Sequence, residues 1–171
     1  MKRVGLYARR IAETLGFPAK YCYDIENYAP LHDVGKVGIA DEILLAPRKL
    51  TKEEFDIIKR HTTLGHGILS DAPSMEMAAE IALGHHEKFD GKGYPYGLAG
   101  DAIPWSARIV ALADVYDALR AERPYKEPWN HRDTIREIVG LKERHFCPSV
   151  VDAFENIESE FEHISISYRD G

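Results

Sequence analysis

The sequence predicts an all-α fold in a single domain spanning residues 1–171. Apolar residues recur every three or four positions along most of the chain, which is the spacing of one helix face. No run alternates apolar and polar residues as a half-buried strand would. A chain of 171 residues is long enough for one sizeable core, and no internal repeat or linker divides it.

The expected helices follow in order along the chain. The first carries Val4 and Ile11 on one face and ends at Gly16-Phe17-Pro18, and the second covers residues 18–31. Thr51 and Glu54 have the spacing of a capping box, which begins a helix over residues 51–69. Further helices are expected over residues 73–85, 103–120, 130–142 and 148–161.

Composition excludes several classes of partner. The net charge of -6 argues against binding to a nucleic-acid polymer, which usually requires a basic surface, whereas a small phosphorylated ligand needs only a few local cations. No segment approaches the roughly 18 apolar residues of a membrane span, and the start lacks the features of a signal peptide. Cys22 and Cys147 have no metal-type spacing and are expected to be reduced thiols of a cytoplasmic protein.

Histidines and aspartates are the candidate functional residues. Adjacent residues on a helix point about 100° apart, so a His-Asp pair near a helix end can serve two neighbouring ions. Asp114 lies among apolar neighbours, and because an unpartnered buried carboxylate costs several kcal/mol, a nearby cation is expected. The joint arrangement selects as metal ligands His32, Asp33, His61, His85, His86 and Asp114.

Other residues of the same types are expected to have ordinary roles. His66, His131, His145 and His163 are expected to be core or surface histidines, and Asp90 and Asp117 to make local hydrogen bonds. A long non-helical segment, residues 89–102, holds four glycines and one proline. Loops of this length in compact domains are often functional.

Four motifs together resemble the HD superfamily of metal-dependent phosphohydrolases, and specifically its HD-GYP branch. They read HDVGKVGI, HTTLGHGIL, HHEKFDGKGYPYGLAGDAIPWSARIVALADVYDAL and RPYK, and the resemblance covers residues 3–126 and, weakly, continues to residue 154. It implies an HD-domain helical bundle with a long glycine-rich loop that contains Gly93, Tyr94 and Pro95. It also implies a bacterial cyclic di-GMP phosphodiesterase with pGpG or GMP as product.

The resemblance also implies a metal site. Asp33 would bridge two ions, with His32 and Asp114 on the first ion and His61, His85 and His86 on the second. This mixed set of imidazoles and carboxylates suits iron or manganese in a di- or trinuclear centre, whereas closed tetrahedral zinc sites use other ligands.

Three cations are expected to contact substrate phosphate. Lys36 lies one helical turn from His32 and can reach the same phosphate as a point charge, so it is expected to act in catalysis with Asp33. Arg123 and Lys126 match positions of further phosphate contacts in the family. The glycine-rich loop is expected to serve as a lid, as a docking surface for GGDEF-domain partners, or as both. An upstream receiver or sensory domain, as in two-component systems, is also expected.

The chain departs from the family pattern at its start. The family has a glutamate and a histidine in the first helix at positions that would precede Met1, and that helix begins inside an amphipathic pattern without a capping residue. We therefore expect a truncated first helix and a second metal site more complete than the first. Cys147 stands where the family more often has an aspartate, and a poorer helix cap is expected there.

Two alternatives stay open at this point. The chain is either an active enzyme or a catalytically weakened HD-GYP signalling module that acts by binding a cyclic dinucleotide or a GGDEF-domain partner. Cyclic GMP-AMP is a possible second substrate. The glycine-rich loop disfavours a generic HD hydrolase of nucleoside triphosphates or guanosine tetraphosphate.

Overall fold

The computed structural model describes residues 1–123 and 126–168, and within these ranges the fold is helical with only isolated β-bridges. The N-terminal half contains α1 (Lys2–Thr14), α2 (Ala19–Tyr28), η1 (Ala29–Leu31), η2 (Val34–Gly38), α3 (Asp41–Leu44), α4 (Lys52–Lys59), α5 (His61–Ser70) and α6 (Glu76–Gly84). The C-terminal half contains η3 (Gly100–Ala102), α7 (Trp105–Arg120), α8 (His131–Gly140), α9 (Pro148–Asn156) and α10 (Glu158–Ser167).

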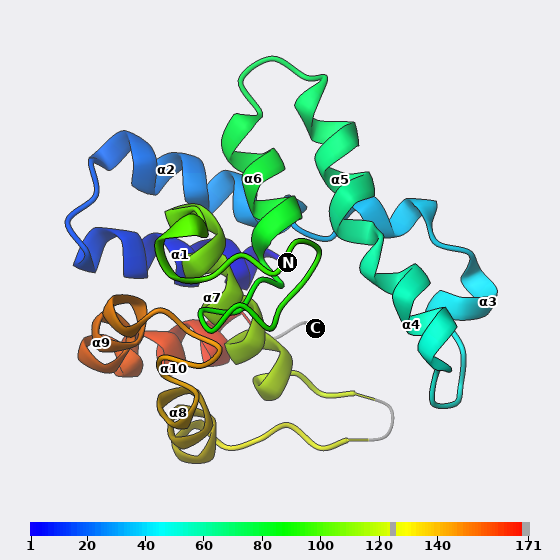
Figure 1. Cartoon of the computed structure of the whole chain (residues 1–171). Helices are drawn as coiled ribbons and strands as arrows, with labels where there is room; N and C mark the ends of the chain where they lie inside the picture. Colours follow the sequence, from blue (N-terminus) through cyan, green and yellow to red (C-terminus); the bar gives the residue numbers. More distant parts are fainter. Residues whose placement is uncertain (124–125, 169–171) are drawn as a thin grey trace.

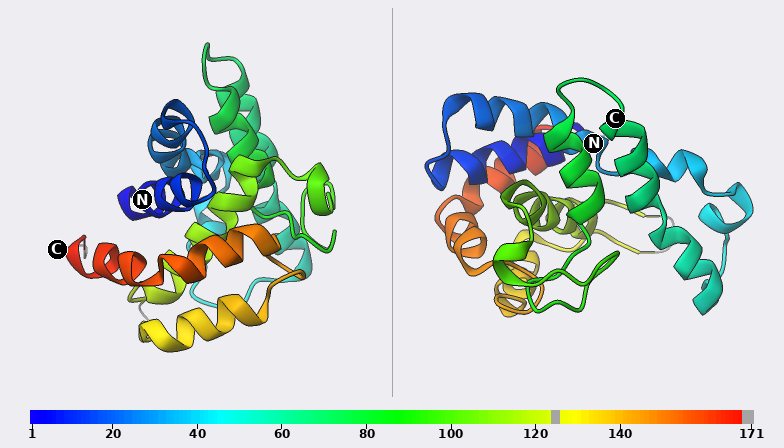
Figure 2. Two further views of the ribbon diagram at one scale, coloured as in Figure 1. Left: turned by 90° about the vertical axis from the view of Figure 1, so that its left-hand side faces the viewer. Right: turned by 45° about the horizontal axis from the view of Figure 1, so that its top comes forward.

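The main core surrounds α7, which packs against α1, α6, α8 and α9. A cluster of buried rings joins the two ends of the chain: Tyr7 of α1 stacks on Phe161 of α10, and Tyr116 of α7 meets both rings edge-on. A second, smaller cluster of Leu69 and three alanines lies between α5 and α6. Figures 1 and 2 show the α5–α6 pair projecting from the rest of the molecule.

The sequence-based boundaries hold at some positions and are wrong at others. The capping box is confirmed, because Thr51 Oγ1 accepts from the Glu54 backbone N–H and the Glu54 carboxylate accepts from the Thr51 backbone N–H. The expected helix 51–69 is instead two helices that meet at Arg60. The expected helix 148–161 likewise breaks at Ile157 and then continues to Ser167. Neither break contains proline or glycine, so no local residue marked it.

Three smaller expectations concern caps, thiols and membrane spans. Cys147 is the N-cap of α9 and makes no side-chain capping bond, as expected. Both cysteines are buried and unpaired. Within the described residues, no helix combines the length and the apolar character that crossing a bilayer requires.

Candidate metal centre

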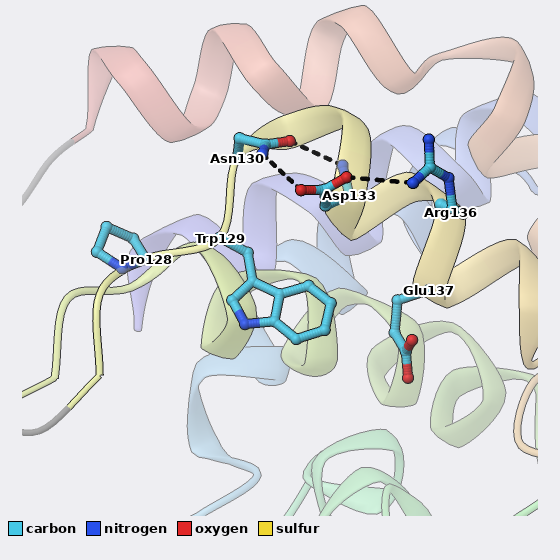
Figure 3. Close-up of a pocket in the computed structure, with 6 residues that line it drawn as sticks. All are labelled: Pro128, Trp129, Asn130, Asp133, Arg136 and Glu137. Carbon is cyan, nitrogen blue, oxygen red and sulfur yellow. Dashed lines mark hydrogen bonds and ion pairs between the residues drawn. The ribbon is translucent and has the colours of Figure 1, made fainter.

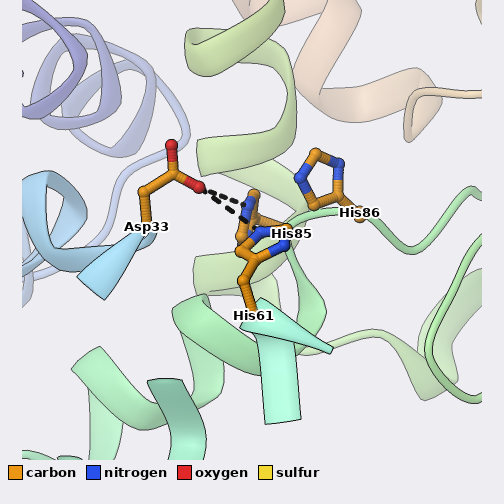
Figure 4. Close-up of side chains that lie close together, drawn as sticks. All are labelled: Asp33, His61, His85 and His86. Carbon is orange, nitrogen blue, oxygen red and sulfur yellow. Dashed lines mark ion pairs between the residues drawn. The ribbon is translucent and has the colours of Figure 1, made fainter. Parts of the chain in front are cut away.

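The structure brings all six candidate ligands together from four segments. His32 and Asp33 lie between η1 and η2, His61 begins α5, His85 and His86 follow α6, and Asp114 lies within α7. Their potential ligand atoms form two groups, each within 4.8 Å. Figure 4 shows the first group, which consists of Asp33, His61, His85 and His86. The second group consists of His32, His85 and Asp114.

Three of the imidazoles are oriented by the same device. In each ring Nδ1 donates to a carbonyl three or four residues earlier, which directs Nε2 into the cluster. The acceptors are Ala29 O for His32 at 2.7 Å, Ile58 O for His61 at 2.7 Å, and Ile81 O and Ala82 O for His85 at 3.0 and 3.1 Å. Nε2 of His61 and Nε2 of His85 are buried without a hydrogen-bond partner. Buried orphan acceptors of this kind are what a metal ion satisfies.

Asp33 lies between the two groups and presents one oxygen to each. Its Oδ1 is 3.3 Å from Nε2 of His61 and 3.8 Å from Nε2 of His85, whereas its Oδ2 is 3.5 Å from Nε2 of His32. Nε2 of His32 is also 3.3 Å from Oδ1 of Asp114. Two ligand atoms about 2.1 Å from one cation lie roughly 3.0–3.4 Å apart, so the two spacings of 3.3 Å suit shared ions.

The environment keeps most of the histidines neutral, the form that binds metal. Burial lowers the pKa of His86 to about 3 and also lowers the pKa values of His61 and His85. Burial acts in the same direction on His32, but the hydrogen bond to Asp114 and the nearby charges of Asp114 and Asp33 together outweigh burial and raise the pKa of His32. Burial raises the pKa of Asp114, but the hydrogen bond to His32 and the attraction of the neighbouring histidines together outweigh burial, and the net pKa is lowered.

Two predicted site residues have environments that the sequence did not indicate. Asp114 was expected to be buried, but its side chain is 29% exposed. Lys36, the expected phosphate contact, places Nζ 2.6 Å from Oδ2 of Asp33. An ammonium group has three donors, so this ion pair leaves two for another anion.

Arg123 and Lys126, the other expected phosphate contacts, exchange backbone hydrogen bonds on either side of residues 124–125, which lie outside the described residues. The Lys126 ammonium lies 4.9 Å from the centre of the Trp129 ring. Trp129 lines a pocket at the start of α8, which Figure 3 shows together with Pro128, Asn130, Asp133, Arg136 and Glu137. Asn130 caps α8 by accepting from the Asp133 backbone N–H.

The glycine-rich loop is held against the cluster by Glu87, which the sequence reasoning did not single out. Glu87 is buried, and its two carboxylate oxygens accept from the backbone N–H groups of Tyr96 and Leu98 at 2.8 and 2.9 Å. The available signal was its position, directly after two candidate ligands and before a glycine-rich loop.

Gly93 and Tyr94 position the loop at closer range. A Cβ on Gly93 would lie 2.5 Å from His86 O, so only glycine permits this approach of the two backbones. The next peptide bond, Tyr94–Pro95, is cis. The Tyr94 ring then stacks on the His86 imidazole, with ring centroids 4.8 Å apart and 21° between the planes.

Among the described residues, Asp90, Asp117 and His131 belong to neither group of candidate ligands. Asp90 makes a local hydrogen bond to the Lys92 backbone N–H, as expected. Asp117 was expected to bond locally but instead pairs with Arg3 of α1, 114 residues away in the sequence. His131 bridges the Tyr116 hydroxyl and the Glu158 carboxylate.

The family model described as HD domain matches residues 1–150. The chain belongs to the HD domain family. Its histidine, aspartate and glycine-loop motifs place it in the HD-GYP branch. A solved structure of a cyclic GMP-AMP specific phosphodiesterase from Vibrio cholerae has the same fold, with a TM-score of 0.70 and 19% identity over 96% of this chain and 47% of that chain.

Two curated relatives are considerably more similar in sequence. A cyclic di-GMP phosphodiesterase of Thermotoga maritima is 49% identical over 161 residues, which are 93% of this chain and 44% of the relative. A 3'3'-cGAMP-specific phosphodiesterase of Vibrio cholerae is 45% identical over 172 residues, which are 99% of this chain and 33% of the relative. This HD-GYP chain therefore spans less than half the length of either relative.

Proposed function

We propose that this HD-GYP chain hydrolyses cyclic di-GMP to pGpG, GMP or both with a centre of at least two metal ions. The observation that carries the proposal is the position of Asp33, whose two carboxylate oxygens face two different groups of candidate ligands. A carboxylate can bridge two cations in this way, whereas a neutral imidazole binds one. The name of the Thermotoga maritima relative supports the choice of substrate.

The donor set fits iron or manganese, because these ions accept mixed imidazole and carboxylate ligands with open positions. His61, His85 and His86 would hold one ion, His32 and Asp114 would hold the other, and Asp33 would contact both. Two adjacent cations, when bound, acidify a water molecule to a nucleophile and neutralise charge on the phosphoryl oxygens.

The surrounding residues orient the substrate and shield the site. Lys36 places an ammonium group beside Asp33, where it supplies positive charge to a phosphoryl oxygen through its two remaining donors. Tyr94 covers one face of His86 and keeps water from that side of the ligand. Glu87 holds the loop that carries Tyr94, so it positions this cover without reaching the substrate.

A second candidate substrate is 3'3'-cGAMP, which the 45% identical relative is named for. The two substrates differ in one purine base and share the phosphodiester ring, so the same metal chemistry serves both. Comparing the hydrolysis of cyclic di-GMP with that of 3'3'-cGAMP decides between the two substrates.

The remaining proposals rest on the family resemblance. We propose that the glycine-rich loop contacts GGDEF-domain partners, since Tyr96 on this loop is 65% exposed. We also propose that a receiver or sensory domain in a longer chain controls the hydrolysis. The enzyme is proposed to act in the bacterial cytoplasm.

The test is hydrolysis by the chain loaded anaerobically with Fe²⁺ or with Mn²⁺, with cyclic di-GMP or 3'3'-cGAMP as substrate and chromatography of the products. Asp33→Asn should abolish turnover, and Asp71→Asn, at an exposed aspartate that ends α5, should leave it unchanged. A metal-loaded wild-type chain that binds cyclic di-GMP without cleaving it would contradict the proposal and favour the signalling-module alternative.

A further inference from the structure

A line of aromatic rings leads from the candidate metal centre to the surface of α4. His86 is followed by Tyr94, stacked on it at 4.8 Å, and Tyr94 is followed by Phe55 of α4, whose ring stands edge-on at 6.4 Å and 81°. Phe55 is 45% exposed, although burial of a phenylalanine is strongly favourable. It therefore presents a ring to solvent, and only the Tyr94 side chain lies between this ring and the candidate metal ligand His86.

Lys59 adds a positive charge beside these rings. Its Nζ lies 5.0 Å from the centre of the Phe55 ring and 5.6 Å from that of Tyr94, both within the range of a cation–π contact. Asp56 accepts from the same Nζ at 2.9 Å. These contacts hold the ammonium group in place, and two of its three donors remain for another acceptor.

The location restricts what such a pair of groups can bind. In a dinucleotide each base is joined to its phosphate through a single ribose. If one phosphate of the ring lies at the metal centre, a base lies only a short distance away. The Phe55–Lys59 edge of α4 lies at such a distance, because only Tyr94 separates Phe55 from His86.

The chemistry of the pair matches one purine better than the other. An exposed aromatic ring stacks with any base, whereas an ammonium group donates only to acceptors. Guanine offers O6 and N7 as two neighbouring acceptors, and lysine is among the usual partners of this edge. Adenine replaces O6 with an amino group that would face the Lys59 ammonium as a second donor.

We propose that Phe55 and Lys59 form a base-binding subsite that stacks one purine of the substrate and selects guanine over adenine. The inference rests on the proposed phosphodiesterase function. It adds a site for one base of the substrate to the site proposed for the substrate phosphate. Phe55 supplies affinity for either purine, and Lys59 supplies the preference between them.

The test measures the KM for cyclic di-GMP and the inhibition constant of cyclic di-AMP as a competitor, on metal-loaded wild-type, Phe55→Ala and Lys59→Met chains. Phe55→Ala should raise both constants about tenfold, in line with the loss of one stacked base, with kcat and metal content retained. Lys59→Met should raise the KM for cyclic di-GMP about tenfold and leave the inhibition constant of cyclic di-AMP nearly unchanged.

Two exposed residues provide matched controls: Lys52→Met at the start of α4 and Tyr23→Ala on α2 should leave both constants unchanged. Changes below twofold in both test variants would overturn the subsite while leaving the phosphodiesterase function intact. Equal effects of Lys59→Met on the two dinucleotides would overturn guanine selection. A metal-loaded wild-type chain that neither binds nor cleaves cyclic di-GMP would refute the proposed function, and this inference with it.

Discussion

Oδ1 of Asp33 lies 3.3 Å from Nε2 of His61, yet no hydrogen bond joins the two atoms. The proton of the neutral His61 ring is on Nδ1, where it bonds to Ile58 O. Nε2 and the carboxylate oxygen are therefore two acceptors with facing lone pairs. Such an arrangement is unfavourable unless a positive charge lies between them. His85 faces the same oxygen at 3.8 Å with its own orphan Nε2.

Removal of one imidazole should empty one ion position without unfolding the chain. His86→Ala deletes a ligand of the group that contains Asp33 and should lower the metal content by about one ion per chain, as measured by elemental analysis. The far-ultraviolet circular dichroism should stay helical, because His86 follows the end of α6 and supports no helix interior. The exposed His163→Ala is the control. Full metal content in His86→Ala would remove this residue from the ligand set.

Lys36→Ala should separate phosphate binding from metal binding. The loss of one charge-assisted contact to phosphate should raise the KM for cyclic di-GMP about tenfold or more, with metal content unchanged. Lys20→Ala, at an exposed lysine of α2, should have no effect. A loss of metal in Lys36→Ala would instead mean that Lys36 acts by holding Asp33 through their 2.6 Å ion pair.

The close approach at Gly93 predicts a large effect from one methyl group. In Gly93→Ala the new Cβ would lie 2.4 Å from Lys88 N and 2.5 Å from His86 O, so the loop must move. We expect a loss of about 3 kcal/mol in the free energy of unfolding, or a displaced loop with reduced turnover. Gly67→Ala in α5 meets nothing within 4 Å and should be neutral or stabilising by up to about 1 kcal/mol. Equal unfolding midpoints in urea for the two variants would contradict this account of Gly93.

The burial of His145 predicts that the free energy of unfolding falls as the pH is lowered below neutral. Burial lowers its pKa to about 4, below the ordinary value near 6.5, so the unfolded chain binds a proton more readily than the folded one. The stability that neutral His145 contributes is present above about pH 6.5 and is lost as the pH falls towards 4. Between pH 7 and pH 5 the loss should be about 2 kcal/mol.

The variant His145→Gln isolates this contribution, because the other histidines titrate equally in both chains. Urea unfolding at both pH values should show a smaller loss of stability in the variant than in the wild type. Equal losses in the two chains would mean that His145 is accessible to protons in the folded state.

Local chemistry accounts for what the sequence predicted correctly. The capping box of α4 lies within four residues, and the glycine loop and the histidine pairs are contiguous motifs, so short segments carry this information. The breaks at Arg60 and Ile157 have no such local marker. Beside the first break η2 packs closely on the start of α5, since a Cβ on Gly35 would lie 1.9 Å from His61 O.

The candidate site was partly predictable for the same reason. Residue types and motifs indicated the six candidate ligands, but the alignment of Nδ1 with a carbonyl of the same segment in three of them is visible only in three dimensions. The role of Glu87 depends on where the loop returns to it, nine and eleven residues later. The Arg3–Asp117 pair depends on the docking of α1 against α7.

The central claim is that Asp33 lies between two metal ions, and anomalous diffraction from crystals of the manganese-loaded chain tests it most directly. Two anomalous peaks are expected, one bounded by Asp33 Oδ1, His61 Nε2, His85 and His86, and the other bounded by Asp33 Oδ2, His32 Nε2 and Asp114. A fully loaded crystal with no peak beside Asp33, or with peaks only at other residues, would contradict it.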